Sequence, residues 1–258
     1  MFLYYIMSVT SVNRAEYKLL NLTLHSNYYD KDAMDKIVSA DDYVIGSITG
    51  GYTKEISNLL FNYLMNNFDL NAYHRIFDIG CGDLRIGMKL LSHLVKGHYF
   101  GLDLLQCLVD KGIENAINNG LEDKIERHHF AVNNNFNYSF LTNERMNCCE
   151  FALAISVFTY LPMSMVKIFL RQLGDCMEVG GKVLITFFQN TTGETGPITQ
   201  VGSKITTTTF PDRAPYHYKL NELARCFKKP WYPHYIGNWG HPGNEKLIIL
   251  KFWPFGPQ

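Results

Sequence analysis

The stretch that decides the fold of this chain is His74-Arg75-Ile76-Phe77-Asp78-Ile79-Gly80-Cys81-Gly82-Asp83-Leu84-Arg85-Ile86-Gly87. A short apolar segment runs into a carboxylate and then into two glycines that are one residue apart. Apolar residues then recur at helical spacing, at Leu84, Met88, Leu90, Leu91 and Leu94. The stretch therefore predicts a strand, a tight turn and a helix.

The two glycines of the turn point to a bound ligand. Gly80 and Gly82 lack a Cβ atom, so the backbone can adopt unusual φ angles and a bulky ligand can approach the helix N-terminus closely. A nicotinamide dinucleotide site would need a third glycine at the position of Arg85, but the next glycine is Gly87. The spacing therefore disfavours a nicotinamide dinucleotide.

Acidic residues end the first strand and the strand that follows it. Asp78 lies where a phosphate would be repelled and an amino or sulfonium group attracted. The segment Tyr99-Phe100-Gly101-Leu102 ends in Asp103, 25 residues after Asp78, and an acid there can accept hydrogen bonds from both hydroxyls of a ribose. A strand-Gly-x-Gly-helix unit alone also occurs as a plain tight turn, but two acids in register favour a cofactor site.

The run Asp78-Ile79-Gly80-Cys81-Gly82, followed by Gly87, resembles the first motif of the Rossmann-like, class I S-adenosylmethionine-dependent methyltransferases. The resemblance implies an α/β fold with a doubly wound, seven-stranded, mostly parallel sheet and a C-terminal antiparallel hairpin. It also implies S-adenosyl-L-methionine as the cofactor, with contacts from Asp78, Gly80, Cys81, Gly82 and Asp103. Leu104 would then lie beside the adenine ring, although simple burial in a helix is the alternative.

Composition limits the partners and the compartment. The chain of 258 residues carries 24 basic and 24 acidic residues, so it has no electrostatic footprint for a polyanion, and nucleic acid is disfavoured as a partner. No pair of its six cysteines has C-x-x-C spacing, which predicts no metal site and a reduced, cytoplasmic protein. The apolar segment at residues 1–7 lacks a basic flank and is too short to span a bilayer, so we expect no membrane anchor.

Residues 1–70 are predicted to form an N-terminal helical extension, and residues 71–258 the methyltransferase domain. Helical spacing occurs at residues 33–39 and 54–65. Between these helices lies a glycine-rich stretch, and the resemblance implies that Gly51 and Tyr52 approach the methionine end of the cofactor. A plain loop is the alternative, because two glycines alone only mark a turn.

Strands and helices alternate after Asp103. We expect a helix over 104–119, a third strand over 125–130, a fourth over 151–155, a helix over 163–177 and a fifth strand over 182–188. This alternation predicts a parallel sheet with right-handed crossovers. In the loop after the third strand many relatives carry an acid that reaches the adenine; here Asn133 is the first candidate, with Asn134 and Asn135 as alternatives.

The exit of the fourth strand, Ser156-Val157-Phe158-Thr159-Tyr160-Leu161-Pro162, resembles the Ser-Val-Phe-Thr-His-Leu stretch of many small-molecule methyltransferases. The resemblance implies that Ser156 contacts the cofactor and that Tyr160 faces the methyl acceptor. Tyr160 stands where relatives often carry a histidine, and a phenol with an ordinary pKa of about 10 is a poorer base. A hydrogen-bonding or wall role is therefore favoured over proton abstraction.

Residues 189–215 show little periodicity and are predicted to form a lid over the acceptor. We expect a helix over 216–227 and a closing hairpin of strands over 231–236 and 246–252. Four histidines are candidate bases near the carboxyl edge of the sheet: His128, His129, His217 and His241. His217, where the lid rejoins the core, is the first choice.

These features predict a methyltransferase that moves a methyl group from S-adenosylmethionine to an oxygen or nitrogen atom of a small molecule. The chain has no Asn-Pro-Pro-Tyr motif and no cysteine at the exit of the fourth strand, which disfavours enzymes that act on nucleic-acid bases. Two alternatives stay open: a protein or tRNA methyltransferase, and a catalytically inactive binding protein or subunit with this fold. The sequence predicts neither the acceptor nor the oligomeric state.

Overall fold

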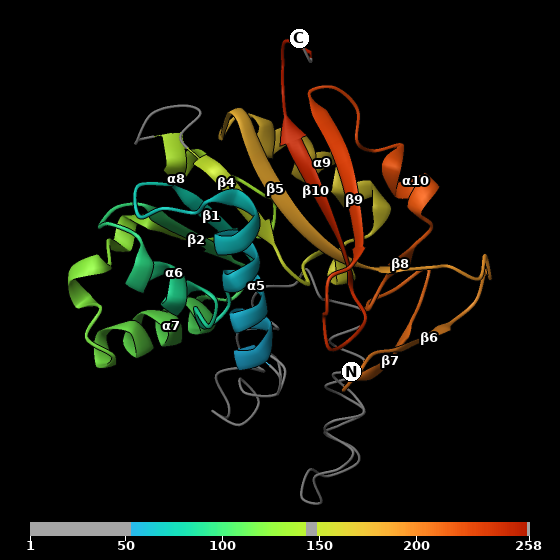
Figure 1. Ribbon diagram of the computed structural model, residues 1–258, viewed down its shortest axis with the longest axis horizontal. Helices are drawn as coiled ribbons and strands as arrows, with labels where there is room; N and C mark the ends of the chain where they lie inside the picture. Colours follow the sequence, from blue (N-terminus) through green and yellow to red (C-terminus); the bar gives the residue numbers. More distant parts are fainter. Residues whose placement is uncertain (1–52, 143–148, 257–258) are drawn as a thin grey trace, which may run out of the picture.

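The computed structural model describes residues 53–142 and 149–256, which are organised around one central sheet (Figure 1). Its strand order is β3-β2-β1-β4-β5-β10-β9, and a short strand β8 pairs with the end of β5. The strands are β1 (Ile76–Ile79), β2 (Tyr99–Asp103), β3 (Phe130–Val132), β4 (Cys149–Ala154), β5 (Met177–Gln189), β8 (His217–Tyr218), β9 (Trp231–Asn238) and β10 (Lys246–Phe252).

The pairing of the strands confirms the predicted doubly wound sheet with a C-terminal hairpin. The first five strands run parallel, and β10 runs antiparallel to both of its neighbours, β5 and β9. The strand order reverses between β1 and β4, and in such sheets ligands bind outside the carboxyl ends of the strands at this point. The two-residue strand β8 is an addition that the sequence did not predict.

Helices cover both faces of the sheet (Figure 1). One face packs against α5 (Thr53–Phe68), α6 (Gly87–His93) and α7 (Gln106–Asn118), and the other against α8 (Ser139–Thr142), α9 (Met163–Gly174) and α10 (Leu220–Ala224). Because successive side chains of a strand point to opposite faces, Ile76 joins the core under α6 and Phe77 the core under α9. The sheet is therefore buried on both sides, as its nearly continuous apolar strands require.

Helix α5 confirms the helix expected over residues 54–65. Its Leu60 and Leu64 are completely buried in the same core as Leu90 of α6. This helix is therefore part of the layer that covers the sheet. The helix predicted over 33–39, the segment 1–7, and Gly51 and Tyr52 lie outside the described residues, so they and the boundary at residue 70 stay predictions.

The third strand lies later in the chain than predicted. Residues 127–129 form a turn of 3-10 helix, η2 (Arg127–His129), closed by a hydrogen bond of 2.8 Å from the backbone N–H of His129 to the carbonyl of Glu126. Strand β3 begins only at Phe130, which is in register with Gly101. His128 and His129 therefore lie at the amino end of β3, so their predicted place near the carboxyl edge is wrong.

The segment predicted as a lid contains a separate hairpin, β6 (Ile198–Val201) and β7 (Thr206–Thr209). The sequence indicated only the second of these strands. Strand β6 was missed because one of its two buried side chains is polar: Gln200, whose amide donates to the carbonyl of Gln189 at 3.1 Å. The tip of the hairpin is attached to α5 through an ion pair between Lys204 and Glu55.

Two further boundaries differ from the predictions. The helix expected over 216–227 begins only at Leu220, because His217 and Tyr218 pair with the end of β5. Helix α9 ends at Gly174, and β5 already begins at Met177, before the glycine pair at 180–181. No helix among the described residues is both long enough and apolar enough to cross a membrane.

Candidate functional site

The turn between β1 and α6 folds over the end of β2. The backbone N–H groups of Gly80 and Cys81 both donate to the carbonyl of Leu102, at 2.7 and 3.0 Å. Gly80 has φ 75°, and a Cβ atom added to it would lie 2.6 Å from a methyl group of Val157. A side chain is therefore excluded at Gly80 by backbone conformation and by space.

Asp103, at the end of β2, is fixed by backbone donors on both carboxylate oxygens. Its Oδ2 accepts from the N–H of Gly82 at 2.8 Å and its Oδ1 from the N–H of Leu105 at 3.0 Å. Burial raises the pKa of Asp103, and these backbone hydrogen bonds oppose the rise. The carboxylate thus joins the glycine turn to the second strand and keeps further lone pairs for the hydroxyls of a ligand.

Asp78, at the third position of β1, is a buried carboxyl with 3% of its surface exposed. Burial raises its pKa to about 7, although a hydrogen bond of 2.7 Å from the hydroxyl of Tyr99 stabilises the charged form. Gly87 makes this contact possible, because a Cβ atom there would lie 2.5 Å from the Tyr99 hydroxyl oxygen. Sequence reasoning noted Gly87 as part of the motif but did not identify its partner.

The other predicted cofactor residues of this half of the sheet lie around Asp103. Cys81 is buried, which raises the pKa of its thiol and leaves it protonated at neutral pH. Leu104 is half-buried. The N–H of Asn133 donates to the carbonyl of Asp103 at 3.2 Å, while its carboxamide closes a turn with the backbone of Asn137. Asn133 is therefore adjacent to the acid, and its carboxamide oxygen keeps one lone pair for a ligand.

The exit of β4 is held by a buried network that sequence reasoning missed. Ser156 has φ 60°, and its N–H donates to the hydroxyl oxygen of Thr186 at 2.7 Å. The hydroxyl groups of Ser156 and Thr186 both donate to the carboxylate of Glu245, at 2.9 and 2.5 Å. Glu245 is only 4% exposed. It immediately precedes β10, which runs antiparallel and so begins at the edge where β4 and β5 end.

His241 and Tyr160 belong to the same edge. The Nδ1 atom of His241 accepts from the backbone N–H groups of Gly243 and Glu245, at 3.1 and 3.4 Å, which places the ring proton of a neutral His241 on Nε2. That nitrogen lies 3.9 Å from Oε1 of Glu245. Burial, with the negative charge of Glu245, raises the pKa of Tyr160 to about 12. Tyr160 therefore keeps its proton at neutral pH, and proton abstraction by its phenolate is disfavoured.

His217 lines a separate cavity of about 800 Å³. Its Nδ1 atom lies 2.9 Å from the hydroxyl oxygen of Thr209, and burial lowers the pKa of its imidazole. Strand β8 is held against the exit of β4 by a hydrogen bond of 2.6 Å from Tyr216 N–H to the Thr159 carbonyl. The cavity lies between the insertion after β5, the start of α9 and α10, and its charged lining residues are Lys167, Glu194, Lys219, Glu222, Arg225 and Lys228.

The predicted residues thus fall into two groups on the carboxyl side of the sheet. Asp78, Gly80, Cys81, Gly82, Asp103, Leu104 and Asn133 surround the ends of β1 and β2, with Ser156 and Tyr160 after the neighbouring strand β4. His217 belongs to the cavity beyond that exit, and none of the other predicted site residues lines this cavity in the described chain. The first group of residues could hold a cofactor, and the cavity beyond the exit of β4 has space for a second ligand.

Comparisons with known proteins show similarity of structure only. No family model matches the chain, and no curated protein matches it in sequence. The magnesium protoporphyrin IX methyltransferase of Synechocystis, solved with S-adenosylhomocysteine, aligns with a TM-score of 0.55 and 11% identity over 91% of this chain and 98% of that chain. An S-adenosylmethionine-dependent methyltransferase of Clostridium acetobutylicum aligns with a TM-score of 0.56 and 12% identity over 88% and 100%.

A third solved structure is a provisionally assigned O-methyltransferase of Nostoc punctiforme. It aligns with a TM-score of 0.54 and 14% identity over 81% of this chain, which spans only 58% of that protein. Strand order, the glycine turn and the reversed strand β10 all agree with these similarities. The chain therefore has the fold of the class I, Rossmann-like S-adenosylmethionine-dependent methyltransferases.

Proposed function

We propose that the protein is an S-adenosylmethionine-dependent methyltransferase that methylates an oxygen or nitrogen atom of a small molecule. The observation that carries the proposal is the pair of carboxyl groups at the ends of β1 and β2, joined by the Gly80-Cys81-Gly82 turn. Asp78 would face the positively charged amino group of the cofactor, and Asp103 its ribose hydroxyls. A phosphate-bearing dinucleotide would meet two acidic groups at this point.

The residues next to this pair suit methyl transfer. S-adenosylmethionine, when bound, supplies a methyl group on a sulfonium, and the protein must mainly align an acceptor lone pair with it and exclude water. Tyr160, protonated at neutral pH, can donate a hydrogen bond that orients the acceptor. His217 has a lowered pKa and is neutral at pH 7, so its imidazole can take the proton that the acceptor releases.

A small-molecule acceptor fits the cavity beside the strand exit. Its volume of about 800 Å³ lies within the range of roughly 300–1,000 Å³ that is common for small-molecule sites. Structural neighbours include enzymes named for small substrates, magnesium protoporphyrin IX and geranyl diphosphate. The net charge of zero continues to disfavour nucleic acid.

Calorimetric titration of the purified protein with S-adenosylmethionine, S-adenosylhomocysteine and a nicotinamide dinucleotide tests the proposal. We expect one-to-one binding of the two sulfur nucleosides and none of the dinucleotide. Transfer of a labelled methyl group to hydroxyl and amine acceptors would then identify the substrate. Binding of none of the three ligands would overturn the proposal and favour a binding protein or subunit that has kept only the fold.

Tyr160→Phe is expected to lower kcat/KM by about tenfold, the effect of losing one hydrogen bond to a reacting group. The dissociation constant of S-adenosylmethionine should stay within about twofold, because the proposal assigns the amino group and the ribose hydroxyls of the cofactor to Asp78 and Asp103 and none of its groups to Tyr160. Since the pKa of Tyr160 is about 12, the pH–rate profile below pH 10 should keep its shape in the variant. A larger effect on cofactor affinity than on turnover would assign Tyr160 to the cofactor instead of the acceptor.

A further inference from the structure

A cluster of three potential metal ligands lies at the edge of the sheet opposite to the cofactor site. Glu126, His128 and His129 precede β3, whose carboxyl end pairs with Asp103. Because β2 and β3 are parallel, the amino end of β3 faces away from the two acidic residues of the cofactor site. The cluster therefore lies outside the machinery of methyl transfer.

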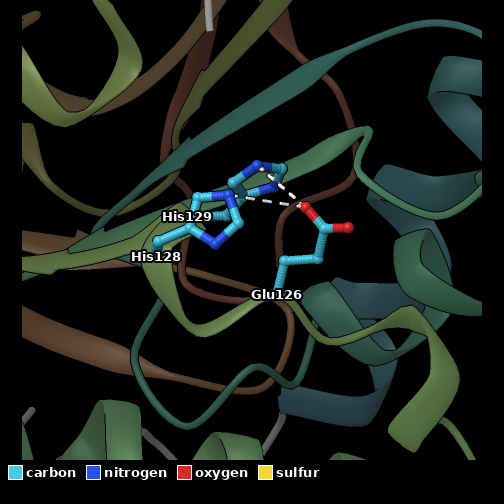
Figure 2. A group of neighbouring side chains, drawn as sticks. All are labelled: Glu126, His128 and His129. Atoms are coloured by element: carbon cyan, nitrogen blue, oxygen red, sulfur yellow. Dashed lines mark ion pairs between the residues drawn. The ribbon is translucent and has the colours of Figure 1, made fainter. Parts of the chain in front are cut away.

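The local backbone brings the three side chains together. In a 3-10 turn, side chains at positions i and i+3 eclipse one another, and here the turn is closed by the hydrogen bond from His129 N–H to the Glu126 carbonyl. The carboxylate of Glu126 thus lies beside the imidazole of His129, and His128 approaches the same carboxylate oxygen (Figure 2).

The distances fit one small ion. Oε2 of Glu126 lies 3.2 Å from Nε2 of His129 and 3.6 Å from Nε2 of His128, and the three ligand atoms are all within 4.8 Å of one another. Zinc bonds of about 2.0–2.2 Å at tetrahedral angles separate neighbouring ligand atoms by roughly 3.4 Å. An ion at the centre of this group needs only small side-chain rotations.

The three side chains of the cluster differ in burial. His129 is 3% exposed, and its ring packs on Phe100 with centroids 4.3 Å apart. The side chain of His128 is 65% exposed and that of Glu126 27% exposed. A metal could therefore enter from solvent and keep water as a fourth ligand, while one imidazole is held in place by the core.

We propose that Glu126, His128 and His129 form a binding site for a divalent transition metal of the zinc class. Two imidazoles and one carboxylate suit zinc, cobalt, nickel or copper better than magnesium or calcium, which prefer all-oxygen ligands. The sequence predicted no metal site because the prediction rested on cysteine spacing alone. The bound ion would fasten the start of β3, an edge strand, to the turn that precedes it.

The test uses the full chain without a histidine tag, freed of metal by a chelator. Titration with zinc chloride is expected to show one equivalent bound, and cobalt should give the visible absorption of a four-coordinate site. His128→Ala and Glu126→Gln should each weaken zinc binding by at least about tenfold, since each removes a ligand. His128 is exposed, so its replacement should leave the far-UV circular dichroism unchanged.

His234→Ala is the matched control, because it removes an exposed histidine from β9, at the other end of the sheet. Zinc affinity should be unchanged in this variant. Equal binding by the wild type, His128→Ala and Glu126→Gln would overturn the proposal as adventitious binding elsewhere. No binding at millimolar zinc would overturn it as well, and would leave the cluster as contacts between one carboxylate and two imidazoles. Neither result depends on whether the protein transfers methyl groups.

Discussion

Asp78→Asn is expected to stabilise the ligand-free protein at pH 8 by on the order of 2–4 kcal/mol. The pKa of Asp78 rises from 3.8 to about 7 on folding, so the folded protein favours the neutral carboxyl. In the wild type, this preference contributes its full stability below pH 3.8, and the contribution is lost as the pH rises to about 7. Asparagine is neutral at every pH and can still accept from Tyr99. Urea unfolding should show the largest gain above pH 7 and little difference near pH 4.

The same substitution should weaken the binding of S-adenosylmethionine by about 100-fold or more, because it leaves a cationic group of the ligand without its partner in a buried site. In the wild type, binding requires an ionised Asp78. Affinity should therefore rise about tenfold per pH unit between pH 5 and 7 and level off above that range. Calorimetry should record the release of a proton below pH 7, and Asp78→Asn should abolish both effects.

Asp110→Asn on α7 is the control, since it removes an exposed carboxylate that accepts a hydrogen bond from Gln106 of its own helix. Neither stability nor cofactor affinity should change appreciably. A stabilised Asp78→Asn variant with normal affinity would place the amino group of the cofactor elsewhere. Unchanged affinity in both Asp78→Asn and Asp103→Ala would overturn the whole site assignment.

The arrangement of the proposed cofactor residues was predictable because these residues are close in sequence. One βαβ unit carries Asp78, the two glycines and Asp103, and parallel pairing of adjacent strands brings their ends together without further information. The start of the following helix was harder to predict. Leu84 is completely buried but has φ 59°, so helix α6 begins only at Gly87. A buried leucine looks the same in a sequence whether its backbone is helical or left-handed.

The other half depends on contacts between distant residues. The carboxylate of Glu245 accepts hydrogen bonds from Ser156, which is 89 residues away in the sequence, and from Thr186, which is 59 residues away. No periodicity in the sequence predicts such pairs. The only signal was an acid directly before an apolar strand. His129, in contrast, was noted in the sequence but predicted at the wrong place. Because β3 starts only at Phe130, His129 lies at the amino edge of the sheet instead of the carboxyl edge.

Glu245→Ala is expected to lower the free energy of unfolding by about 3–5 kcal/mol, since it removes two hydrogen bonds to a charged acceptor, each worth roughly 1.5–3 kcal/mol. The hydroxyl groups of Ser156 and Thr186 would lose their acceptor, and Thr186 is completely buried. Ser156, a non-glycine residue at φ 60°, would also lose a contact that holds its conformation. Urea unfolding measures the loss, and a variant as stable as the wild type would contradict the network.

Glu245→Gln tests the negative charge of Glu245 separately from its hydrogen bonds to Ser156 and Thr186. Its amide oxygen can still accept from Thr186 and its hydroxyl partners can rotate, so we expect a loss of only about 1 kcal/mol. The negative charge beside Tyr160 disappears, however, and under the proposed function that charge would stabilise the positive charge that develops on an acceptor during methyl transfer. We therefore expect kcat to fall about tenfold to 100-fold with KM for the cofactor nearly unchanged. Glu114→Gln, which removes an exposed carboxylate of α7 that pairs with Lys111, should keep kcat within about twofold. A wild-type kcat in Glu245→Gln would mean that Glu245 acts only by holding the hydroxyl groups of Ser156 and Thr186 in place, because its hydrogen bonds would then be sufficient without its charge.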